Sequence, residues 1–312
     1  STAFPGGGEQ ANDPHRWVRY GMLRYQHADL PEAALLMTTA VVLAKTQAER
    51  EVVVNGKKRK IVGAIKGRRY LAFAIVGGAT LVICGLIFMD NVSTALMLMF
   101  VVIVMMFVGH IPKDLMFKGL LALFAAGAIM VMAAMVIPDN VLKQNNALKR
   151  VVTVKHRVMR MFEVYDKPSN EEEKPVDAKK MLNDENSQKT YAFIAVANSN
   201  VIGLGPGNSI QRDFLQHAES DFIYAIIIEE LGIAGALFVA FLYLALLIRV
   251  GRIALRCPTF FPAFLVLGFG IMIVLQAFVN MSVAVFPGVV TGQPLPLISK
   301  GGTSILITSF YI

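Results

Sequence analysis

Acidic and small polar residues gather between Gly203 and Gly232, where a glycine-rich loop leads into an apolar segment. Asp221 stands at the start of that segment. A carboxylate at a membrane surface can act as a general base, because it can accept a proton from a hydroxyl within hydrogen-bond reach. Glu229 and Glu230 follow two turns later in the apolar run, where charge is costly and usually functional. The junction is therefore a candidate site for chemistry on a lipid-borne substrate.

A structural role competes with the catalytic one at this junction. Ser220 and Asp221 precede a predicted helix. Ser and Asp are favoured there because their side chains accept hydrogen bonds from the free N–H groups and suit the helix dipole. One residue can fill both roles, so the residue types alone leave the two interpretations open.

The elements that must position these residues are membrane helices. The 312 residues are 55% hydrophobic, with 16 Met and 20 Phe, and the mean hydropathy is +0.56. Apolar runs long enough to cross a bilayer recur along the chain, although the first is short. We predict helices at 30–45, 70–89, 93–109, 115–137, 222–248 and 260–281, with a last one beginning near 304. The predicted fold class is an all-α, polytopic membrane protein.

Basic residues indicate which ends of these helices face the cytoplasm. They cluster at 45–69, 113–118 and 249–258. Placing all three clusters in the cytoplasm satisfies the positive-inside rule with every helix alternating. The segments predicted to face outward are 1–28, 138–220 and 282–303. The clusters explain the net charge of +8 as topology signals with secondary contact to anionic membrane lipid, so no nucleic-acid partner is expected.

Cysteine and histidine positions favour neither a disulfide nor a metal site. Cys84 lies within a predicted helix and Cys257 on the cytoplasmic side, so this topology keeps them apart. The five His are scattered without ligand spacing. The sequence requires no cofactor or metal, although a divalent cation is compatible with it.

Three blocks of the sequence resemble the signature of one family. The first, at 208–232, reads NSIQRDFLQHAESDFIYAIIIEELG and is similar to G-N-S-x-Q followed by (T/S)-D-F-I-F-A and E-E-L-G. The second, at 290–306, reads VTGQPLPLISKGGTSIL and is similar to T-G-x-x-L-P-F-I-S-Y-G-G-S-S. The third, at 15–30, reads HRWVRYGMLRYQHADL and is similar to R-W-I-x-x-G-x-x-x-x-Q-P-S-E-L. In this order, the blocks resemble the SEDS family (shape, elongation, division and sporulation proteins), and its division-type more than its elongation-type members.

The resemblance implies a fold and an activity. SEDS proteins have ten membrane helices, of which about seven are expected here, in a single domain over 1–312 that is incomplete at both ends and contains the large extracytoplasmic loop 138–220. The family polymerises lipid II, an undecaprenyl-pyrophosphate-linked substrate, into glycan strands at the outer face of the bacterial cytoplasmic membrane. Its partners are a class B penicillin-binding protein transpeptidase and other membrane proteins of the division or elongation machinery.

The resemblance also implies residue roles. Asp221 takes the position of the catalytic Asp, the general base for the acceptor sugar hydroxyl. Basic and donor groups must stabilise the leaving pyrophosphate. The implied substrate-binding residues are Arg16, Asn208, Gln211, Ser299, Lys300, Gly301 and Gly302. Hydrogen bonds within the loop explain Asn208 and Gln211 equally well. For Glu229, Glu230 and Asn280, within the membrane, we favour ties between helices over contact with substrate.

Departures from the family pattern and two other function classes stay open. Asp29 and Glu32 are like-charged where the family has a pair able to attract, and Asn91 replaces a carboxylate. The same intramembrane acids could serve a lipid II flippase, and a non-catalytic scaffold of the division machinery is a further alternative. The runs 93–109 and 115–137 contain no acidic residue, which disfavours transport across the whole membrane depth.

Overall fold

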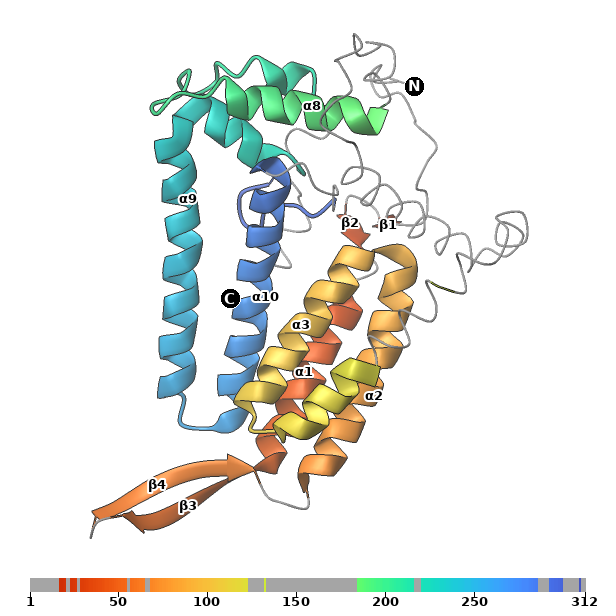
Figure 1. The fold of residues 1–312 in the computed structure, drawn as a ribbon, viewed down its shortest axis with the longest axis vertical. Coiled ribbons are helices and arrows are strands. Elements are labelled where there is room, and N and C mark those ends of the chain that lie inside the picture. Colours follow the sequence, from red (N-terminus) through yellow and green to blue (C-terminus); the bar gives the residue numbers. More distant parts are fainter. Residues whose placement is uncertain are drawn as a thin grey trace, which may run out of the picture.

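The transmembrane part consists of two groups of helices along a common direction (Figure 1). The first holds α1 to α3, the second α9 and α10, and α8 lies across one end. The computed structural model describes residues 17–20, 23–26, 29–54, 57–64, 68–122, 132, 184–215, 220–285, 292–299 and 309. The helices and hairpins described below are formed by these residues.

The first group agrees closely with the hydropathy prediction. Its helices are α1 (Asp29–Thr46), α2 (Arg68–Asp90) and α3 (Val92–Val108), each within two residues of a predicted span. Asn91 begins α3 as its N-cap, and its side-chain oxygen accepts from Ser93 N at 3.1 Å. Asn is as good an N-cap as Asp, so the missing carboxylate at position 91 leaves the start of α3 capped.

The second group is an antiparallel pair. It consists of α9 (Ile223–Arg256) and α10 (Phe260–Val285), which pack against each other, while α10 also contacts α1 and α3. The helix predicted at 222–248 is longer than expected. Its last two turns carry Arg249, Arg252 and Arg256, good helix formers, so only residues 257–259 connect the pair.

Within the described residues, three helices are long and apolar enough to cross a membrane: Arg68–Phe88, Ile223–Arg256 and Phe260–Val285. The apolar helix α3 is shorter. Helix α1 falls outside this group, and its 18 residues include the charged Asp29, Glu32 and Lys45. Of the span predicted at 115–137, the described residues 115–122 and 132 are helical, and this helix begins at residue 113. Most of the segment expected from 304 lies outside the described residues.

Two antiparallel hairpins and one further helix were not predicted. Strands β1 (Trp17–Tyr20) and β2 (Leu23–Gln26) pair with each other. Strands β3 (Gln47–Val54) and β4 (Lys57–Ala64) form a second hairpin within the basic segment 45–69, at the end of the molecule opposite α8 (Figure 1). Asn55-Gly56 between them is the dipeptide most favoured in two-residue hairpin turns. Helix α8 (Asp184–Ala197) lies within the predicted loop 138–220.

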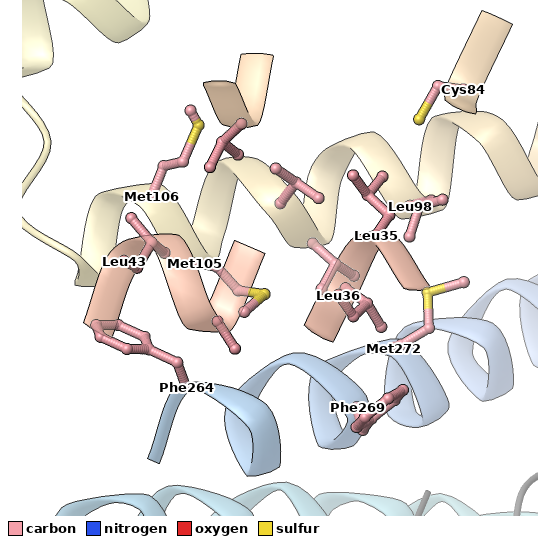
Figure 2. Close-up of a cluster of buried hydrophobic side chains, with 14 of the residues drawn as sticks. Leu35, Leu36, Leu43, Cys84, Leu98, Met105, Met106, Phe264, Phe269 and Met272 are labelled. Atoms are coloured by element: carbon pink, nitrogen blue, oxygen red, sulfur yellow. The ribbon is translucent and has the colours of Figure 1, made fainter. Parts of the chain in front are cut away.

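Two clusters of buried apolar side chains hold the helices together. The first joins α1, α2, α3 and the first half of α10, and Figure 2 shows Leu35, Leu36, Leu98, Met105 and Met272 interlocking there. The second joins α8, α9, the second half of α10 and Leu295. Helix α10 belongs to both clusters, so it links the two groups of helices.

Candidate functional site

Asp221 lies at the end of the molecule where α8 crosses the helices (Figure 1). The positive-inside rule predicts that this is the outer end, and we call it so below. Helix α9 begins at Ile223, and its N-cap is Phe222, which makes no side-chain cap hydrogen bond. The cap position thus falls after Ser220 and Asp221 rather than on either of them. Both residues are partly buried.

The backbone on either side of Asp221 is held by side chains from distant segments. Asn280 on α10 donates to the carbonyl oxygen of Asp221 through Nδ2 at 2.9 Å. Ser299 donates to the carbonyl oxygen of Ser220 at 2.7 Å, and the same hydroxyl accepts from Leu295 N at 2.7 Å. These bonds fix two consecutive peptide groups, so the position of the Asp221 Cα is set by α10 and by the segment 292–299.

That segment is itself tied into the helices by one glutamine. The backbone carbonyl of Gln293 accepts from Asn280 Nδ2 at 2.7 Å. Its side chain donates through Nε2 to Thr94 Oγ1 on α3 at 2.6 Å and accepts from Gln276 Nε2 at 3.2 Å. Tyr243 on α9 donates to the carbonyl of Pro296. We call the bonds among these residues, Asn280 and Ser299 the polar network; it joins α3, α9, α10 and the Asp221 segment.

Helix α9 is broken at Gly232, where φ is 69° and ψ is −170°. In a continuous helix, Ile233 N and Ala234 N would donate to the carbonyls of Glu229 and Glu230. Instead, those carbonyls accept from Leu204 N and Gly205 N, each at 2.9 Å, while the two N–H groups donate to the carbonyls of Asn200 and Val201, at 3.2 and 3.3 Å. The loop 200–205 thus replaces all four backbone partners that the break removes.

The break requires glycine on both sides of the contact. A Cβ on Gly232 would lie 2.4 Å from the carbonyl oxygen of Val201, and one on Gly203 would lie 2.4 Å from that of Glu230. Both have positive φ, 69° and 78°, which glycine adopts without steric cost. Broken membrane helices are tolerated where neighbouring groups satisfy the freed backbone, and the loop does so here.

Glu229 fixes the next part of the same loop. Its carboxylate is fully buried, with 0% of the residue exposed. It accepts from the Ser209 hydroxyl at 2.5 Å and from the backbone N–H groups of Ile210 and Gln211 at 3.3 and 3.4 Å. These donors open the short 3-10 helix Gln211–Asp213. The carboxylate therefore satisfies free N–H groups that would otherwise be buried without partners.

The predicted site residues fall into three sets. Asp221, Asn280 and Ser299 come together at the outer end of α9 and α10. Gln211 lies with Glu229 in the adjoining loop. Arg16, Lys300, Gly301 and Gly302 lie outside the described residues.

The two remaining predicted site residues, Asn208 and Glu230, belong to none of these three sets. Asn208 is exposed, and its Nδ2 donates to the carbonyl of Leu204 at 3.1 Å. Glu230 is partly buried and enters the loop contact through its backbone carbonyl.

Sequence reasoning missed Gln293, Gln276, Thr94 and Ser209. Their signal was present, because Gln293 stands in a matched block and Thr94 and Gln276 lie within predicted membrane spans, where polar residues are rare and usually functional. Ser209 stands beside Asn208 in another matched block. Asn208, Gln211, Asn280 and Ser299 were singled out from the same neutral residue types, but these four were not.

Three polar atoms at this end are buried without a hydrogen-bond partner among the described residues: Asn91 Nδ2, Gln211 Oε1 and Asn280 Oδ1. Buried polar atoms are nearly always paired, so Gln211 Oε1, in the loop, could accept a bond from a hydroxyl or amide of a bound molecule. In the part of the chain that the structure describes, no group of three or more His, Cys, Asp or Glu side chains could hold a metal ion.

The chain is similar to known proteins over nearly its whole length. A family described as cell cycle protein, covering FtsW, RodA and SpoVE, matches residues 3–312. A Bacillus subtilis relative named "Probable peptidoglycan glycosyltransferase FtsW" is 29% identical over 302 residues, 96% of this chain and 66% of its own length. A protein of that name from Nitrosomonas europaea is 28% identical over 313 residues, 99% of this chain and 69% of its own.

Two solved structures share the fold. One, titled "Structural coordination of polymerization and crosslinking by a peptidoglycan synthase complex", has a TM-score of 0.57 at 24% identity, covering 94% of this chain and 69% of that chain. The other is a variant of the rod shape determining protein RodA of Thermus thermophilus, with a TM-score of 0.50 at 21% identity, covering 94% and 65%.

The chain thus spans just under two thirds of the Bacillus subtilis relative, at 66% of its length. It is a multi-pass protein of the bacterial cytoplasmic membrane, as the family match and the three long apolar helices among the described residues indicate. Since the match covers residues 3–312, the chain belongs to the FtsW/RodA/SpoVE family of cell cycle proteins, the SEDS family that the three sequence blocks predicted.

Proposed function

We propose that the protein is a peptidoglycan glycosyltransferase that polymerises lipid II into glycan strands at the outer face of the membrane, for cell division or elongation. The names of its relatives support this activity. The observation that carries the proposal is the placement of Asp221 at the outer end of α9, on a backbone held by Asn280 and Ser299. A general base must be held within reach of its hydroxyl, and this anchoring provides the rigidity that catalysis requires.

In the proposed reaction, Asp221 accepts the proton of the acceptor sugar hydroxyl. The hydroxyl oxygen forms the new glycosidic bond as the bond from the donor sugar to pyrophosphate breaks. Undecaprenyl pyrophosphate leaves, and Arg16 and Lys300, with the backbone N–H groups of Gly301 and Gly302, stabilise its developing charge. The reaction as written needs no metal, and a divalent cation would assist at the pyrophosphate.

The remaining site residues take binding or positioning roles. Asn208 and Gln211 contact the sugar or peptide, and the unpaired Oε1 of Gln211 is available as an acceptor. Ser299 acts by holding the Ser220 carbonyl, because its hydroxyl already donates one bond and accepts another. Glu229, Glu230 and Asn280 join the helices and the loop rather than touching substrate.

The direct test is Asp221→Asn in the full-length protein, assayed with labelled lipid II. Asn is nearly isosteric but cannot take up the proton, so we expect polymerisation to fall about 10²–10⁴-fold while folding is unchanged. Asp213→Asn, a nearby loop acid outside the matched motif, is the control and should stay active. Near-normal strand synthesis by the Asp221 variant would place the base elsewhere. Lipid II transport without polymerisation by the unaltered protein would instead favour a flippase.

We propose further that the protein works with a class B penicillin-binding protein transpeptidase and with other division or elongation membrane proteins. The solved relative comes from a complex that coordinates polymerization and crosslinking. Such a transpeptidase should co-purify with the full-length protein and raise its polymerisation rate. Full activity alone, with no transpeptidase retained, would contradict the proposal.

The proposed domain is a single SEDS membrane domain over 1–312 with the loop 138–220 outside the cell. A thiol reagent that does not cross membranes should label Lys180→Cys in intact cells and leave Lys58→Cys unlabelled. The unaltered protein is the control, because Cys84 is buried and Cys257 lies at the cytoplasmic end of α9. Labelling at position 58 alone would invert this topology.

A further inference from the structure

A cavity of about 440 Å³ opens at the cytoplasmic end of the molecule, opposite Asp221. Its lining comes from the last two turns of α1 and from the start of α10: Val41, Ala44, Lys45, Thr259, Phe260 and Phe261. It is an open depression between the two helices rather than an enclosed cavity. No residue of the proposed active site lines it, so it calls for an explanation of its own.

The lining suits a hydrocarbon chain. It is apolar except for Lys45 and Thr259. Val41 and Phe261 are 37% and 41% exposed, so a bound molecule can reach the apolar lining. An apolar hollow offers water too few hydrogen-bond partners to hold it in place. An acyl chain, in contrast, would pack against the two phenylalanines and the small Ala44.

Two cations stand at the rim. Lys45 is exposed in the last turn of α1. The exposed Arg68 donates from Nη1 to the carbonyl of Lys45 at 3.2 Å, which brings its guanidinium beside the same turn. Among the residues that the structure describes, neither cation forms an ion pair. Both are therefore available to an anion at the level of the lipid headgroups.

We propose that this cavity binds an anionic phospholipid of the cytoplasmic leaflet. One acyl chain lies against Phe260 and Phe261, and the phosphate lies between Lys45 and Arg68. Basic pockets between membrane helices on the cytoplasmic side are a recognised form of anionic lipid site. A free phosphate would use the cations but leave the apolar lining empty, whereas a diacyl phospholipid satisfies both.

The test is native mass spectrometry of the full-length protein, reconstituted with phosphatidylglycerol or with phosphatidylcholine of the same chains. Phosphatidylglycerol should remain bound through delipidation, and Lys45→Gln should lower its retention about fivefold, the effect of one cation at an anionic surface. Phosphatidylcholine should be retained less than phosphatidylglycerol, and Ala44→Trp, which fills the hollow, should abolish retention of phosphatidylglycerol. The matched control is Lys113→Gln, another exposed cytoplasmic cation, 5.4 Å from the Phe107 ring.

Three outcomes would overturn the proposal. Equal loss of phosphatidylglycerol in the Lys45 and Lys113 variants would mean a diffuse charge effect. If Lys45→Gln retained phosphatidylglycerol fully but had a lower free energy of unfolding, Lys45 would act only by stabilising the C-terminal end of α1. Release of the bound lipid by inorganic phosphate alone would mean that the cations bind phosphate without the chain.

Discussion

The cluster of α1 to α3 and the outer end of α9 and α10 are held together by different means. In the first, apolar side chains interlock, and the hydroxyls of Thr38, Thr46 and Thr80 bond to carbonyls of their own helices. In the second, polar side chains bond backbone and side-chain groups far apart in the sequence, as between Thr94 and Gln293. Packing fixes where helices lie, whereas directed bonds fix the position of individual peptide groups.

This difference matches what each region does. Lipid tails are as apolar as leucine, so helices in a membrane associate through close packing and hydrogen bonds rather than by exclusion of water. The α1–α3 cluster needs only complementary shape. If Asp221 is the general base that we propose, its segment must hold the carboxylate in one place, and its supports are bonds with fixed partners. Substitutions in the apolar cluster should therefore change mainly the free energy of unfolding, whereas substitutions in the polar network should also change the rate of polymerisation.

The largest effect is expected from Gly232→Ala. The added methyl would meet the carbonyl oxygen of Val201 at 2.4 Å, and the positive φ disfavours alanine. Together these should lower the free energy of unfolding by about 3 kcal/mol or more. Thermal unfolding in detergent measures it. Gly251→Ala in the same helix, where a Cβ would meet nothing within 4 Å, should have little effect, and equal losses would show that the break is not the cause.

The apolar cluster should respond to loss of volume. Leu98 is 0% exposed, and Leu98→Ala leaves a cavity. The cost should be about 2 kcal/mol, below the usual range, because the removed methyl groups would face lipid in the unfolded state. Leu98→Met, which keeps the volume, should cost less. Lipid II polymerisation per folded molecule should be unchanged in Leu98→Ala. A slower rate would mean that the apolar cluster also positions the Asp221 segment.

Glu229→Gln keeps the shape of the loop anchor and removes its charge. Ser209, Ile210 and Gln211 then share a weaker acceptor, and the free energy of unfolding should fall by about 1.5 kcal/mol, the lower end for bonds to a charged group. Proteolysis of the loop should quicken. Glu230→Gln is the control, since Glu230 enters the loop contact through its backbone. Equal sensitivity in both variants would refute a specific anchor at Glu229.

Thr94→Val should give the smallest effect on stability and a clearer one on activity. Valine is nearly isosteric, but it leaves the Gln293 amide without its acceptor, costing about 1 kcal/mol. The segment that holds Ser220 loosens, so lipid II polymerisation should slow several-fold. Thr38→Val is matched to it, because the Thr38 hydroxyl bonds only to the carbonyl of Ala34 in its own helix. Unchanged activity in Thr94→Val would mean that the polar network does not position Asp221.

Most of the helices and part of the site were predictable from the residues. Helices α1, α2, α3 and α10 agree with the hydropathy prediction, because the hydropathy of a segment depends only on its own residues. Glu229 was expected to tie helices together, whereas the bonds of its carboxylate described above go to the loop residues Ser209, Ile210 and Gln211. The hairpin in 45–69 was missed although Asn55-Gly56 is a hairpin signal, since the segment was considered only as a carrier of charge.

The sequence by itself determined the membrane character, the family and the identity of the candidate base, because hydropathy and motif spacing are local properties. Only the tertiary structure decided that loop 200–205 enters the break at Gly232 and that Gln293 joins Thr94 to Asn280. Every peptide group carries the same donor and acceptor, so residue types cannot say which distant pair will meet. That choice depends on which segments the packed helices bring together.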